Sequence, residues 1–75
     1  MEMEQEAAME TEIGHAAGTI WRYLDRHGEI SLAKLERGTK LPERLLLMGC
    51  GWLAREGKLT LVRDGRSLQV SLKGH

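Results

Sequence analysis

The sequence predicts an α+β fold in which three helices are followed by a two-stranded β-hairpin. Two observations support this prediction. Up to about Gly57, apolar residues recur at three- and four-residue steps, the spacing of helices that bury one face. After Gly57, apolar and polar residues alternate on both sides of Asp64-Gly65, a dipeptide typical of two-residue hairpin turns. Elements in this order along a chain make a winged helix-turn-helix.

The chain has 75 residues, which allow one domain with a small core. Such a core often supplies only about 3–5 kcal/mol, so small domains commonly gain stability from a partner subunit. The single cysteine, Cys50, excludes an intramolecular disulfide and suits a reducing compartment. No apolar run is long enough to span a membrane, and the N-terminus is acidic, unlike a secretory signal. We therefore expect a cytoplasmic protein that makes no membrane contact.

Charge is distributed unevenly along the chain although the net charge is zero. Residues 1–12 include five glutamates and no basic residue, so all eleven lysines and arginines follow them, against six acids. This asymmetry predicts an acidic, partly disordered tail at residues 1–10 and a winged helix domain at residues 11–75. A solubilising terminus is the favoured interpretation of the tail, and an autoinhibitory segment is the alternative.

The first helix is expected from about Thr11 to His27, with Gly28 as its C-cap. Its apolar residues follow the helical period: Ile13, Ala17, Ile20 and Leu24. Gly14 and Gly18 weaken the helix by about 1 kcal/mol each relative to alanine. They lie one turn apart, where the missing side chains would let a neighbouring helix come close.

The next two helices have recognisable starts and ends. Ser31 follows a short extended piece and is a good N-cap for a helix that continues to about Gly38. Pro42 suits the first turn of the third helix, and Gly57 suits its C-cap. The third helix carries one apolar stripe, formed by Leu45, Leu46, Gly49, Trp52 and Leu53.

The hairpin register follows from its turn. Centring the turn on Asp64-Gly65 pairs Arg63 with Arg66 and extends the ladder toward the helices. The apolar pairs would be Leu61 with Leu68 and Leu59 with Val70. We expect these four side chains to share the face that covers the helices.

Beyond the order of its elements, the run from Gly51 to Lys58 (GWLAREGK) resembles a signature of one protein family. Ile20–Leu24 and Gly28–Ser31 match the opening of the same family. This is a family of short prokaryotic winged helix-turn-helix proteins catalogued as a domain of unknown function, and the likeness spans residues 13–72. The resemblance implies the fold strongly and the function weakly.

The sequence contains no catalytic constellation. His15, His27 and His75 are scattered without metal-ligand spacing, and Cys50 has no histidine at a motif-like position. A half-buried structural thiol is therefore the favoured interpretation of this cysteine. We expect neither an enzyme nor a cofactor, a metal or a small-molecule substrate.

Double-stranded DNA is the partner that the fold suggests. Six basic residues near the helix turn and the hairpin tip are the candidate contacts: Lys34, Arg37, Lys40, Arg44, Arg63 and Arg66. Glu43 would repel phosphate, and Leu47 and Met48 form a poor surface for reading bases. The alternative, that the six are ordinary solvated charges, stays open.

The third helix has more apolar residues than one buried face needs. We expect Leu47, Met48 and Cys50 to point outward and form a homodimer interface, with Trp21 and Trp52 as core anchors. The chain is thus interpreted as a small DNA-binding or transcription-associated protein. The alternative is a protein-interaction or homodimerisation module that has the winged helix fold and does not bind DNA.

Overall fold

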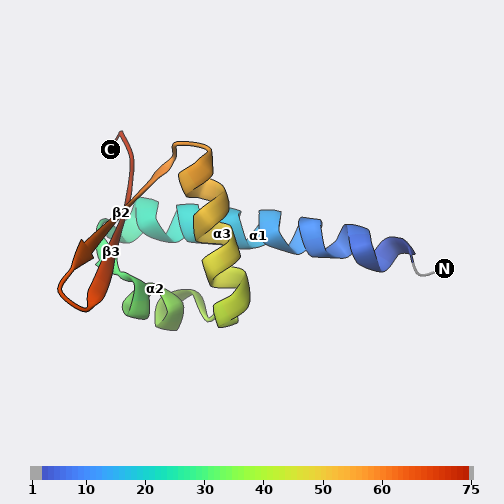
Figure 1. Ribbon diagram of the computed structural model, residues 1–75, viewed down its shortest axis with the longest axis horizontal. Helices are drawn as coiled ribbons and strands as arrows, with labels where there is room; N and C mark the ends of the chain where they lie inside the picture. The colour runs from blue at the N-terminus through green and yellow to red at the C-terminus, as the bar shows by residue number, and fades with distance from the viewer. Residues whose placement is uncertain (1–2, 75) are drawn as a thin grey trace.

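The computed structural model describes residues 3–74, with side chains from Met9 onward, and it confirms the α+β prediction. Its elements are α1 (Met3–His27), β1 (Ile30–Ser31), α2 (Leu32–Thr39), α3 (Glu43–Arg55), β2 (Leu59–Asp64) and β3 (Ser67–Leu72). In Figure 1, α3 crosses α1, while α2 and the sheet gather around the C-terminal half of α1. The molecule is therefore a helical body closed at one end by a small sheet.

Helix α1 begins at Met3, earlier than the start near Thr11 that the sequence indicated. Alanine and glutamate favour helix, and acidic residues near a helix N-terminus interact well with its dipole, so α1 continues through this stretch. Figure 1 shows these first turns projecting beyond α3. Of the predicted acidic tail, residues 1–2 lie outside the described residues.

Local capping signals define the other helices. The Ser31 hydroxyl accepts a hydrogen bond from the Lys34 backbone N–H at 3.2 Å, as predicted for an N-cap. Helix α3 ends in a Schellman motif, in which the Gly57 N–H donates to Ala54 and the Lys58 N–H donates to Leu53. Gly57 has a φ of +75°, which a residue with a side chain rarely adopts.

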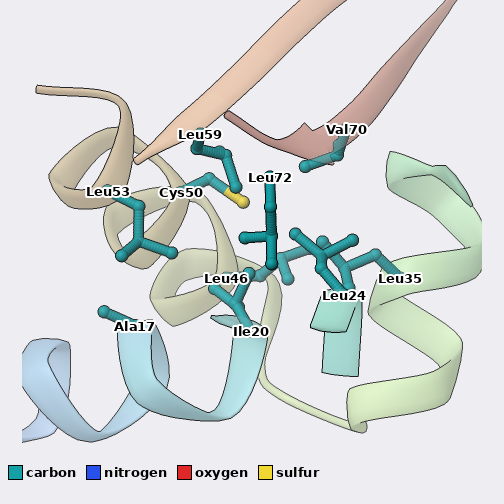
Figure 2. Close-up of a cluster of buried hydrophobic side chains, with 10 residues drawn as sticks. All are labelled: Ala17, Ile20, Leu24, Leu35, Leu46, Cys50, Leu53, Leu59, Val70 and Leu72. Carbon is teal, nitrogen blue, oxygen red and sulfur yellow. The ribbon is translucent and has the colours of Figure 1, made fainter. Parts of the chain in front are cut away.

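The core forms where α1, α2, α3 and the sheet meet, and Figure 2 shows its ten buried side chains. They are Ala17, Ile20, Leu24, Leu35, Leu46, Cys50, Leu53, Leu59, Val70 and Leu72. Gly49 brings α3 close to α1, because a Cβ at this position would lie 2.8 Å from Ile20 Cδ1 and 3.2 Å from the Ala17 backbone nitrogen. The glycine that lets α3 approach α1 is therefore Gly49, and not, as expected, Gly14 or Gly18.

The sheet has the order β1-β3-β2, with both pairs antiparallel. The predicted hairpin register is wrong, because Asp64 pairs with Ser67 and Leu61 pairs with Val70. The two turn residues are Gly65 and Arg66, and only Gly65 has a positive φ, which fits a type II′ turn. Moving the turn by one residue moves each partner by two, so the alternation of faces is preserved.

Burial is confined to the base of the hairpin. Leu59 and Val70 are buried as expected, and Leu68 is half-buried, but Leu61 is 40% exposed and Val62 is 52% exposed. The outer half of the hairpin is mostly exposed and approaches the helices at Ser67 and Leu68, which lie beside α2. It is a projecting wing, and its tip is available to a partner.

Candidate nucleic-acid interface

The turn between α2 and α3 is held by hydrogen bonds from both its side chains and its backbone. Thr39 Oγ1 donates to the Leu35 carbonyl at 2.8 Å and accepts from the Leu41 N–H at 3.4 Å. Lys40 ends α2 in the left-handed region, with a φ of 60°, and its N–H donates to Glu36 at 2.9 Å. Lys40 is the only described residue other than glycine with a positive φ. A lysine side chain is therefore displayed at a position where glycine is the usual residue.

All six basic residues predicted to contact DNA are exposed. Lys34 and Arg37 lie one turn apart on the side of α2 opposite the buried Leu35. Lys40 follows in the turn, and Arg44 lies in the first turn of α3. Together they form a basic stretch along the helix-turn-helix.

The wing tip adds its arginines to this stretch. Arg66 and Ser67 line a shallow pocket together with Leu32, Ala33 and Glu36 of α2, so the tip lies beside α2. In Figure 1 the tip, α2 and the start of α3 lie toward the same side of the molecule, away from the chain's C-terminus. Arg63 stands opposite Leu68 in the same hairpin. The two arginines thus extend the basic stretch.

The outward face of α3 differs from this basic stretch. Leu47 is 48% exposed and Met48 is 39% exposed, as expected from the sequence. Trp52 is also 48% exposed, so the prediction that it anchors the core is wrong, whereas Trp21 is half-buried against the core. Trp52 lies four residues after Met48, so the two side chains share one face of α3. Because Met48 was expected to be exposed, this spacing in the sequence indicated that Trp52 would be exposed as well. Between the exposed Arg44 and Arg55 at its two ends, this face consequently offers few polar atoms that could read base edges.

Cys50 does not point outward as expected for the dimer interface, because it is 3% exposed and its sulfur is turned into the core (Figure 2). Leu46, Cys50 and Leu53 share the side of α3 that meets α1 and the sheet. Burial raises the pKa of the Cys50 thiol from 9.0 to about 11. A thiol that stays protonated at neutral pH is a poor nucleophile, so its role is packing.

The described residues were also compared with the requirements of a metal site and of a membrane-spanning helix. Within the part of the chain that the structure describes, no group of three or more histidine, cysteine, aspartate or glutamate side chains is arranged to hold a metal ion. None of the described helices is long and apolar enough to cross a bilayer.

The fold and the helix-turn-helix geometry define a winged helix-turn-helix protein. Sequence comparison agrees: the family described as "Winged helix-turn-helix domain (DUF2582)" matches residues 3–72, and the chain belongs to it. The chain is also similar to the uncharacterized protein MJ1608 of Methanocaldococcus jannaschii, with 36% identity over 64 residues. That alignment covers 81% of this chain and 90% of the archaeal protein.

Proposed function

We propose that this chain binds double-stranded DNA, mainly through the phosphate backbone. The observation that supports the proposal is the stretch of exposed basic side chains from the wing tip along α2 to the start of α3. The ion pair between Lys58 and Glu56, at 3.5 Å, involves none of them. The apolar outer face of α3 argues against extensive base reading. Binding with little sequence preference and a strong salt dependence therefore follows.

A backbone amide NMR titration with a short DNA duplex tests the proposal. At low salt we expect shifts concentrated at residues 40–47 and 63–66, and high salt should remove them. An absence of shifts at about millimolar duplex would contradict DNA binding, since non-specific complexes form at or below this concentration.

The wing contribution is tested with the double variant Arg63→Ala plus Arg66→Ala. Loss of two phosphate contacts should weaken binding and reduce the slope of log affinity against log salt by about 2. The matched control is Arg26→Ala plus Arg55→Ala, which removes the same charge from exposed positions outside the basic stretch. An equal loss in both variants would mean that only net charge matters and that the wing is not a contact.

The exposed apolar side chains of α3 support a second candidate function, a protein-interaction module. Leu47, Met48 and Trp52 are between 39% and 48% exposed on one helix, and exposed apolar patches on small proteins commonly mark protein contacts. On this alternative, Leu47→Glu yields a folded monomer from a dimeric wild type. A variant dimer of unchanged stability would exclude Leu47 from the contact.

A further inference from the structure

Two glycines on the surface of α1 have no atom of another described helix within 4 Å of the position that a Cβ would take. Nothing lies within 4 Å of a Cβ placed on Gly14. A Cβ on Gly18 would meet only the Arg22 side chain, whose Nη1 would be 3.3 Å away. Each glycine weakens α1, and neither is needed for packing inside the chain. The helix surface is therefore open to a backbone that this copy does not supply.

These glycines belong to a row with a regular charge pattern. Glu10, Gly14, Gly18 and Arg22 follow one another at four-residue steps, so they form one ridge on the helix surface. The ridge is acidic at its N-terminal end, has no side chains in its middle, and is basic at its C-terminal end. The two charged side chains are exposed.

Such a ridge is complementary to itself when a second α1 lies antiparallel across it. If Gly14 of one copy faces Gly18 of the other, the same register sets Glu10 against Arg22, and two-fold symmetry repeats both contacts. The opposite charges would attract, and the glycines would let the two backbones come close.

The surroundings of the ridge offer apolar surface that a second helix could cover. Gly14, Gly18 and Arg22 border an open groove of about 630 Å³ between α1 and the end of α3. Trp21 and the exposed Trp52 also line this groove. Lys73 and Lys58, the latter paired with Glu56, leave its edge with a net positive charge, whereas residues 1–10 of the chain include four glutamates and no basic residue. The N-terminal turns of α1 therefore have the charge that the groove favours.

We propose that a second copy of this chain docks antiparallel on α1, with Glu10 of each copy facing Arg22 of the other. Ridges of this type interdigitate when two helices cross at about −50°. The groove beside the ridge is lined by the end of α3 and by none of the six basic residues of the basic stretch. The basic stretch thus stays uncovered in the dimer, which then offers twelve candidate cations rather than six, more than the six to ten contacts typical of useful DNA affinity.

Charge reversal on the ridge tests this dimer directly. Glu10→Arg alone places two arginines opposite each other at both ends of the contact, and Arg22→Glu alone does the same with two glutamates. Each variant should raise the dimer dissociation constant at least about tenfold, because two attractions become two repulsions. Sedimentation equilibrium from about 10 μM to about 1 mM chain covers the affinities of such a small interface.

Mixing the two variants gives the decisive result. A Glu10→Arg chain with an Arg22→Glu chain restores opposite charges at both ends, so the mixture should form a heterodimer while each variant alone is monomeric. The control is Glu12→Arg, which makes the same charge change on α1 outside the ridge and should leave the dimer intact. A wild type that stays monomeric throughout this range overturns the proposal, as does a mixture that stays monomeric.

The variant Gly14→Gln distinguishes an effect on dimerisation from an effect on the stability of the monomer. Gly14→Gln has room for its side chain in the monomer and removes a helix-weakening glycine, so it should raise the melting temperature of dilute protein. The same side chain blocks the close approach and should weaken dimerisation. If Leu47→Glu abolishes the dimer while Glu10→Arg and Gly14→Gln leave it intact, the second copy docks on α3 and the proposal is overturned.

Discussion

The α1–α3 junction and the α2–α3 turn use backbone geometry in opposite ways. At the junction, Gly49 has no side chain because the backbone of α1 occupies the space. At the turn, Lys40 keeps a long charged side chain in a left-handed conformation that glycine would adopt with less strain. The packing of α3 on α1 explains why residue 49 is a glycine. The left-handed conformation of Lys40 lowers stability, and a role for its cation at the surface would explain why residue 40 is a lysine.

The largest effect in this comparison is expected from Gly49→Leu. A side chain at this position meets the Ile20 side chain and the backbone of Ala17, so the helices must separate. We expect a loss of about 3 kcal/mol or more in the free energy of unfolding, comparable to the whole stability of a small domain. Urea denaturation followed by circular dichroism measures it.

The control for this variant lies two residues along the same helix. A Cβ added to Gly51 would have nothing within 4 Å of it, so Gly51→Ala should stabilise the protein by about 0.5–1 kcal/mol. If Gly49→Leu unfolds at the same urea concentration as the wild type, the close contact between α1 and α3 at Gly49 is wrong.

An intermediate effect is expected from Cys50 in the same core. Its pKa is about 11 in the folded chain against an ordinary value of 9.0, because burial disfavours the thiolate. At a pH between these two pKa values, the Cys50 thiol loses its proton in the unfolded chain and keeps it in the folded chain. The stability associated with this thiol is therefore complete below pH 9.0 and falls by about 2–3 kcal/mol as the pH rises to about 11.

The free energy of unfolding, measured at a series of pH values, checks this prediction. Cys50→Ala removes the thiol and should show a shallower decline of stability over the same pH range. Equal slopes in the two proteins would show that the thiolate is not disfavoured by burial.

The smallest effect, and the sharpest for function, is expected from Lys40→Gly. Glycine relieves the left-handed strain, so we expect the folded chain to gain about 1 kcal/mol. If Lys40 contacts phosphate, the same variant should reduce the salt slope of DNA binding by about 1. Thermal melting and a salt titration of affinity measure the two quantities. A gain in stability with unchanged DNA affinity would leave Lys40 without a binding role.

Signals confined to neighbouring residues predicted the local structure well. The N-cap at Ser31 and the glycine cap at Gly57 depend on a few adjacent backbone groups, and both are present in the structure. The hairpin turn was misplaced by one residue, because Asp64-Gly65 and Gly65-Arg66 each satisfy one type of tight turn. The choice between them depends on how β3 pairs with β1 and packs on the helices, which is not a local property.

The orientation of α3 was harder to predict than its existence. Cys50 and Trp52 lie on opposite flanks of the stripe that contains Leu46 and Leu53. Hydrophobicity favoured burial of the tryptophan, but Gly49 sets where α1 crosses, and this crossing buries the flank of Cys50. The exposed candidate residues were easier to identify, because charged side chains near turns are rarely buried.

The pairing of Ile30 with Val70 also has a consequence for the synthesis of the chain. Val70 and Leu72 are buried between helices that are translated long before them. During translation the three helices therefore emerge with part of their shared apolar surface uncovered. The domain can close only after Leu72 has left the ribosome, and until then the nascent chain is open to chaperones and to aggregation.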